Sequence, residues 1–270
     1  MKNKNIVFLH SPRSGGTTLN SILRYQYGID SIHSFHNGFA SDSIESYLDL
    51  SEIDKNRIKC FRGHIIFGLH QYCPRDCIYI TILRHPIKRV LSLFGYISGF
   101  RGISLQKPKA QTNLENFLTE GHKGYTPNDQ VRRIAGINRD KRLNLYELKT
   151  AQENIENHFA VVAITERFDE SILLTKKVLN WKKEPWFIKN NRQGSGDMSF
   201  IIPSYLIEKI RNQNELDIEL YNYARCRLQK QLKQQNVSDR ELKRFNFVNR
   251  NIVAQCAPPV LSLFRQWRKQ

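Results

Sequence analysis

The chain has 270 residues, enough to bury a full hydrophobic core, and 40% of them are hydrophobic, which excludes a disordered protein. Its 42 Lys and Arg residues outnumber 25 Asp and Glu residues, giving a formal net charge of +17. This excess predicts an anionic ligand or partner: nucleotide phosphates, an acidic glycan, nucleic acid or an anionic membrane surface. No apolar run is long enough to span a bilayer, so we expect no transmembrane anchor.

The five cysteines are an odd number and form no dense framework. With no signal peptide evident, we expect reduced thiols and a cytoplasmic location. Cys73 and Cys77 are close enough in sequence to share a metal ion, but no second Cys/His pair at zinc spacing accompanies them. We therefore expect no metal site.

The first predicted element is a buried strand at Ile6–Leu9, followed by a turn with two glycines and an amphipathic helix. A strand, a glycine-containing loop and a helix N-terminus together form an anion site, because the first-turn amides are unpaired and the helix dipole favours negative charge. Arg13 adds a guanidinium fork suited to phosphate or sulfate oxygens. The residues that we predict to bind such a group are Pro12, Arg13, Ser14, Gly15, Gly16, Thr17 and Thr18.

This loop lacks the Walker A pattern, because its basic residue Arg13 precedes the glycines and no Lys follows them. A P-loop nucleotide kinase or hydrolase holds Mg²⁺ through the hydroxyl after that Lys. Such an enzyme is the alternative function on the same general fold, and a tight turn rich in small residues is the alternative structure.

Further along the chain, apolar runs alternate with helical stretches, which is typical of a parallel sheet flanked by helices. We expect an α/β, P-loop-like fold in a single domain over residues 1–270, with a basic, helical C-terminal extension from about residue 203. The segment Arg101–Asn113 reads as a loop beside the site. The other predicted elements are strands at Ile58–Gly63, Cys77–Leu83 and Phe159–Ile164 and helices starting at Pro86, Asn128, Ala151 and about Asp169.

Two segments resemble the signatures of PAPS-dependent sulfotransferases, where PAPS is 3′-phosphoadenosine-5′-phosphosulfate. Ser11–Leu19, with the sequence SPRSGGTTL, resembles the loop that cradles the 5′-phosphosulfate. Leu83–Ser92, with the sequence LRHPIKRVLS, resembles the segment whose first Arg and final Ser grip the 3′-phosphate. The resemblance thus implies that Arg84 and Ser92 bind the donor. Weaker matches near Arg62, Asn128 and Thr165 fit the carbohydrate branch, of the heparan 2-O-sulfotransferase-like kind.

The resemblance implies transfer of a sulfuryl group from PAPS to an acceptor hydroxyl, expected on a carbohydrate, with release of adenosine 3′,5′-bisphosphate and no metal requirement. Arg13 stands where the family usually has Lys, and we expect it to stabilise charge without donating a proton. His64 follows a strand, in a Gly-His position where glycan-modifying relatives carry a catalytic His, so it is our candidate base. His10 and His70 are its competitors.

Several other polar residues could either line the site or have a structural role. Arg192 lies in a segment that resembles a late donor-binding segment of the family, and we expect it to contact the donor. Asn128, Gln130 and Arg132 fit either a cleft or a solvated helix face. Glu166 and Arg167 fit a structural ion pair.

The basic C-terminal part allows two further interpretations. Its basic residues are spread over helices without interleaved aromatic residues, so we expect no nucleic-acid binding. Pro258–Gln270 mixes apolar and basic residues. We expect a docked terminal helix there, with peripheral membrane contact as the alternative.

Overall fold

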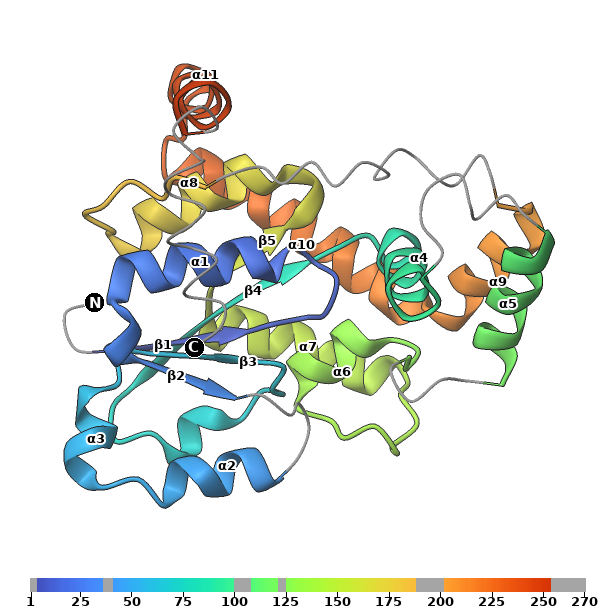
Figure 1. Ribbon diagram of the computed structural model, residues 1–270, viewed down its shortest axis with the longest axis horizontal. Coiled ribbons are helices and arrows are strands. Elements are labelled where there is room, and N and C mark those ends of the chain that lie inside the picture. Colours follow the sequence, from blue (N-terminus) through green and yellow to red (C-terminus); the bar gives the residue numbers. More distant parts are fainter. Residues whose placement is uncertain (1–3, 36–40, 100–107, 121–124, 188–201, 254–270) are drawn as a thin grey trace.

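The computed structural model describes residues 4–35, 41–99, 108–120, 125–187 and 202–253 (Figure 1). Its centre is a five-stranded parallel sheet with the strand order β2-β3-β1-β4-β5, which confirms the predicted α/β class. The strands are β1 (Asn5–Leu9), β2 (Ile32–Phe35), β3 (Cys60–Gly63), β4 (Cys77–Leu83) and β5 (Phe159–Ile164).

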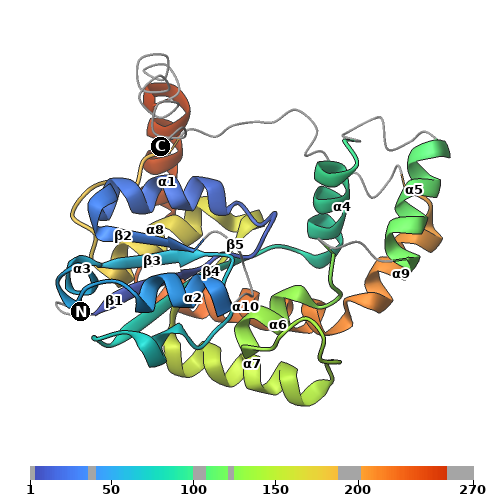
Figure 2. The ribbon, with the colours of Figure 1, turned by 60° about the horizontal axis from the view of Figure 1, so that its bottom comes forward.

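Helices cover both faces of this sheet. Figures 1 and 2 show α1 and α8 on one face and α6 and α7 on the other. The helices are α1 (Gly16–Tyr27), α2 (Ser41–Leu48), α3 (Glu52–Arg57), α4 (Pro86–Ile97), α5 (Pro108–Thr119), α6 (Asp129–Ala135), α7 (Leu145–His158), α8 (Phe168–Leu179), α9 (Ser204–Gln213), α10 (Glu215–Gln234) and α11 (Asp239–Phe247).

The central strands are buried on both faces, as expected for a parallel sheet between two helical layers. Val7, Phe8 and Leu9 of β1 have no exposed surface. The chain leaves β1 toward β2 and β3 and then crosses to β4 on the other side of β1. The connections after β1 and β3 therefore diverge, and such a switch point is where α/β sheets bind ligands.

A second apolar cluster holds α4 in place. It joins α4 to α5 and α9, which Figure 2 shows grouped beyond the ends of the strands. Val90 and Leu206 are fully buried in it. The helix that carries Ser92 is thus packed on a rigid support rather than left at the surface.

The structure departs from the predicted elements in several places, and the helices α2 and α3 were not predicted at all. The edge strand β2 was missed, since its four residues include His33 and Ser34 and give little apolar signal. The predicted loop Arg101–Asn113 is wrong from residue 108 onward, where α5 begins. The helix predicted from Ala151 starts at Leu145 instead, because Asn144 and Glu147 form a capping box.

Candidate active site

Side chains from the ends of neighbouring strands converge at one edge of the sheet. His10, His64, Arg84 and Thr165 each come directly after a strand: β1, β3, β4 and β5, respectively. Since all these strands are parallel, their carboxyl ends meet at the same edge. The edge coincides with the switch point around β1, so the predicted site residues lie where the fold places ligands.

The loop between β1 and α1 has the backbone of an anion cradle. Arg13 and Gly15 adopt left-handed conformations, with φ of 65° and 85°, and Arg13 is one of the few non-glycine residues in this region. No hydrogen bond among the described residues uses the backbone N–H groups of residues 14 to 17. Gly15 and Thr17 are exposed. The N–H groups of Gly15 and Thr17 are therefore available to an anion, whereas Ser14 and Gly16 are buried.

The direction of the loop amides is set by bonds to the carbonyls beside them. The Arg84 guanidinium donates from Nη1 to the Arg13 carbonyl at 3.0 Å, and the Thr165 hydroxyl lies 2.8 Å from the Ser14 carbonyl. A trans peptide points its C=O and N–H in opposite directions. Because these two carbonyls face Arg84 and Thr165, the N–H groups of Ser14 and Gly15 face the other way.

The two signatures meet through Arg13 and α4. Arg13 Nε donates to Ser92 Oγ at 3.3 Å, and its guanidinium carbon lies 4.7 Å from the centre of the Tyr96 ring. Ser92 and Tyr96 are one turn apart on the same helix face. The structure therefore brings the first loop and the second signature into direct contact, although 79 positions separate Arg13 and Ser92 in the sequence.

Side chains hold the backbone around Arg84 where the sheet ladder ends. The Arg84 N–H donates to Gln130 Oε1 at 2.9 Å, and Gln130 Nε2 donates to the Arg84 carbonyl at 3.0 Å. On the other side of the chain, Thr165 Oγ1 lies 2.9 Å from the Leu83 carbonyl, and the His85 N–H donates to Glu166 Oε1 at 3.2 Å. These bonds replace neighbouring strands and fix the peptides on both sides of Arg84.

His64 has a defined neutral tautomer. Its Nδ1 lies 3.0 Å from the His10 carbonyl, which can only accept a hydrogen bond, so Nδ1 carries the proton and Nε2 keeps its lone pair. Burial lowers the pKa of His64, the bond to His10 offsets part of this effect, and the nearby Arg133 lowers the pKa further. His64 is thus a neutral imidazole near pH 7, with a basic nitrogen at Nε2.

The competing histidines have other surroundings. The His10 ring stacks on the His64 ring with centroids 4.3 Å apart, and burial followed by the charges of His64, Arg133 and Arg62 lowers the pKa of His10 to about 3. His70 lies 3.0 Å from the hydroxyl of Tyr79, in the amino-terminal half of β4. His70 is therefore away from the strand ends, and His64 is the histidine that has both the location and a defined free nitrogen.

A buried charge cluster that the sequence analysis missed supports His64 and α4. Asp129 accepts from Arg133 Nε at 3.0 Å and from Arg89 Nη1 at 3.3 Å, and all three residues are at most 4% exposed. Burial opposes ionisation of Asp129, but the two guanidinium groups outweigh it and hold its pKa below the usual range. Arg133 Nη1 also donates to the His64 carbonyl at 3.0 Å. The cluster therefore links the candidate base to the helix of Ser92.

The structure also shows the surroundings of Gln130, Glu166 and Arg167. Gln130 is fully buried, so neither a cleft surface nor a solvated helix face describes it. Arg167 pairs with Glu170 at 2.6 Å, whereas Glu166 accepts from the Tyr221 hydroxyl at 2.9 Å, so these neighbours have separate structural partners. Arg192 and the stretch Pro258–Gln270 lie outside the described residues.

Two further observations concern metals and membranes. In the described ranges, no three His, Cys, Asp or Glu side chains are grouped as metal ligands. Over the same ranges, none of the helices combines the length and the apolar character needed to cross a membrane.

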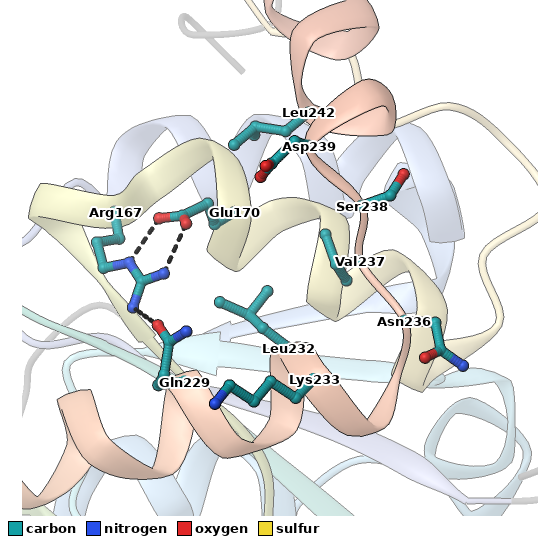
Figure 3. Close-up of a pocket in the computed structure, with 10 residues that line it drawn as sticks. All are labelled: Arg167, Glu170, Gln229, Leu232, Lys233, Asn236, Val237, Ser238, Asp239 and Leu242. Carbon is teal, nitrogen blue, oxygen red and sulfur yellow. Dashed lines mark hydrogen bonds and ion pairs between the residues drawn. The ribbon is translucent and has the colours of Figure 1, made fainter.

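A cavity of about 440 Å³ lies between α8, α10 and α11 (Figure 3). It contains none of the residues predicted to bind the donor. Its cationic side chains, Arg167 and Lys233, are matched by Glu170 and Asp239. Figure 3 shows Arg167 already bonded to Glu170 and Gln229. The cavity therefore does not select an anion, and the strand-end site remains the candidate.

Comparison with known proteins decides the family. The profile of the galactose-3-O-sulfotransferase family matches residues 2–261. The chain belongs to the galactose-3-O-sulfotransferase family. This replaces the expected heparan 2-O-sulfotransferase-like branch within the same superfamily. The short signatures could not separate the branches, because their resemblance concerns the donor, which all branches share.

Individual relatives agree with this assignment. The chain is 31% identical over 166 residues to galactose-3-O-sulfotransferase 3 of Mus musculus, covering 57% of this chain and 38% of that protein. It is 24% identical to the Homo sapiens protein of the same name, covering 82% and 56%, and 27% identical to Homo sapiens galactosylceramide sulfotransferase, covering 71% and 49%. The chain thus spans about half the length of these curated relatives.

A solved structure of a mouse sulfotransferase complexed with PAP aligns with 82% of this chain and 89% of that chain. The sequence identity is 14% and the TM-score is 0.29, which is too low to establish a shared fold.

We predict that Gly16→Ala disrupts the site. A Cβ on Gly16 would lie 1.9 Å from His10 Nε2, and the stacking of His10 on Phe8 and His64 leaves its ring little room to move. Overpacking of this kind costs about 1–3 kcal/mol. Binding of adenosine 3′,5′-bisphosphate, measured by calorimetry, should weaken at least about tenfold. Ser21→Ala, at a half-buried position in the same helix, should bind normally. Equal binding by Gly16→Ala and the wild type would contradict the packing argument.

We also predict that Asp129→Ala lowers the free energy of unfolding by about 3–5 kcal/mol, because it removes the carboxylate that pairs with buried Arg133 and leaves buried Arg89 with only the more distant Asp217. The matched control is Glu153→Ala, which removes the exposed ion pair with Lys149. That loss should be at most about 0.5 kcal/mol. Urea denaturation measures the free energy of unfolding of both variants. Similar losses would show that the buried cluster stabilises the fold no more than an exposed ion pair does.

Proposed function

We propose that this chain transfers the sulfuryl group of PAPS to the 3-hydroxyl of a galactose residue in a glycan or glycolipid. The observation that carries the proposal is the contact between the two donor signatures, Arg13 Nε to Ser92 Oγ, inside a family defined by galactose 3-O-sulfation. The acceptor follows from the names of the family and its relatives, one of which is named for galactosylceramide. The expected cytoplasmic location stays a prediction.

The donor is gripped at two ends in this proposal. The N–H groups at the start of α1 and the Arg13 guanidinium bind the 5′-phosphosulfate, and Arg84 and Ser92 bind the 3′-phosphate. The geometry supports assigning the two ends of PAPS to different residues. The loop N–H groups face away from Arg84 and Thr165, and Ser92 lies on α4. Arg192 is a further proposed donor contact, by resemblance alone.

The chemical step is an in-line displacement at sulfur. The acceptor oxygen forms the new O–S bond, the bond from sulfur to the phosphate oxygen breaks, and the acceptor proton passes to His64 Nε2. Negative charge that develops on the leaving phosphate is stabilised by the loop N–H groups and by Arg13, which are fixed before the reaction. Arg13 supplies charge and hydrogen bonds but no proton.

The function is tested with labelled PAPS and a pair of acceptors. A terminal β-galactoside should become sulfated, and the matching 3-deoxygalactoside should not. A heparan-type acceptor serves as the control for the superseded branch. Transfer to the 3-deoxy compound would overturn the regiochemistry, and the absence of transfer to any galactoside would overturn the acceptor.

We predict that Arg13→Ala reduces kcat by about 10²–10³-fold. This is the usual effect of removing one preorganised hydrogen-bond donor that stabilises a developing negative charge. Arg13→Lys should recover much of this rate, because Lys keeps the charge. Steady-state kinetics at saturating PAPS provides the measurement. Near-normal turnover by Arg13→Ala would exclude a role in the chemical step.

We predict an acid limb in kcat/KM whose midpoint lies below 6.5, the ordinary pKa of His. The lowered pKa of His64 keeps its base form populated to more acidic pH, so activity is retained below 6.5 and lost as the pH falls through the folded-state pKa. His64→Gln should lose about 10²–10⁴-fold in rate and should also lose this limb. An unchanged pH profile in His64→Gln would assign the base to another group.

A further inference from the structure

The hydroxyl of Thr165 contacts both donor signatures. Its Oγ1 lies 2.8 Å from the Ser14 carbonyl, in the first signature, and 2.9 Å from the Leu83 carbonyl, in the second. Thr165 follows β5, which is the strand next to β4, and it is separated from Ser14 by 151 positions. One side chain from a third segment thus bridges the two halves of the site.

This bridge fixes how far apart the two signatures lie and how one amide points. The Ser14 carbonyl belongs to the peptide whose N–H is that of Gly15. Since the peptide is planar and trans, holding its oxygen at Thr165 aims the Gly15 N–H to the opposite side. A carbonyl that accepts a hydrogen bond also polarises its own amide, which makes the N–H a stronger donor.

The same segment supports the loop at a second point. A Cβ on Gly15 would lie 3.5 Å from Cε2 of Phe168, so the Phe168 ring packs under this residue. Gly15 has a φ of 85° and no side chain of its own to anchor it. The position of the Gly15 amide therefore depends on the turn and helix start at Thr165–Phe168.

Building on the proposed function, we propose that Thr165 is a positioning residue for the PAPS site, which acts by orienting the Gly15 amide toward the donor and by tying the loop to the end of β4. Thr165 does not touch the donor in this account. A hydroxyl has one proton, so the Ser14 and Leu83 carbonyls share it, and the bridge needs an O–H at this position rather than bulk.

The test uses two substitutions at Thr165 and one elsewhere. Thr165→Val keeps the shape and removes the O–H, while Thr165→Ser keeps the O–H and removes a methyl group. Thr175→Val is the matched control, because Thr175 Oγ1 also donates to a backbone carbonyl, that of Ser171, but within α8 and away from the loop. Each variant is measured for thermal stability, for the Kd of adenosine 3′,5′-bisphosphate and for kcat and KM with PAPS.

We expect Thr165→Val to weaken binding of the bisphosphate and to raise the KM for PAPS by about tenfold, a loss in line with one buried bond left unmade. Thr165→Ser should bind within about twofold of the wild type. Thr175→Val should lower stability without changing the Kd. This combination separates orientation of the site from general destabilisation, which would affect Thr165→Val and Thr175→Val alike.

Three results would overturn the inference. Wild-type affinity in Thr165→Val would show that the hydroxyl does not orient the amide. Equal losses in Thr165→Val and Thr165→Ser would assign the effect to packing. Equal losses in Thr165→Val and Thr175→Val would assign it to stability. In each case a wild-type protein that binds the bisphosphate and sulfates galactosides would leave the proposed function intact, whereas a wild type that binds neither PAPS nor the bisphosphate would overturn both.

Discussion

The site depends on two planar trans peptides in the loop before α1, Arg13–Ser14 and Ser14–Gly15. Once the carbonyls of Arg13 and Ser14 are bonded to Arg84 and Thr165, the direction of the following N–H groups is no longer free. The loop can thus present its N–H groups to an anion without reorganising when the anion binds. Hydrogen-bond donors that are oriented before the reaction stabilise developing charge more than flexible hydrogen-bond donors do.

Asp129 and Gln130, at the start of α6, hold the segments around this loop in place. Gln130 pairs with both the N–H and the C=O of Arg84, and its neighbour Asp129 joins Arg89 of α4 to Arg133. The short helix α6 therefore contacts the backbone of Arg84, the helix of Ser92 and the backbone of His64. The hydrogen bonds of this connected set hold the three segments in one arrangement.

Much of this could be predicted from sequence, and the failures have physical causes. β4 matched its predicted limits because Cys77–Leu83 is rich in β-branched and aromatic residues and contains no breaker, and Arg13 and Ser92 carried a recognisable pattern. The roles of Asp129, Gln130 and Arg133 were missed, because polar residues on a short helix look solvated until tertiary packing is known. The positioning of Thr165 was equally invisible, since it depends on carbonyls 82 and 151 positions away. The galactose branch needed whole-chain comparison, because the donor signatures say nothing about the acceptor.

The most direct test of the account is a calorimetric titration of the wild type and of Ser92→Ala with adenosine 3′,5′-bisphosphate. We expect saturable binding of one bisphosphate per chain to the wild type. We expect weaker binding to Ser92→Ala, because one phosphate contact is lost together with the residue that holds Arg13. Binding of equal strength in both proteins would contradict the joining of the two signatures into one donor site. No binding to the wild type would contradict the site itself.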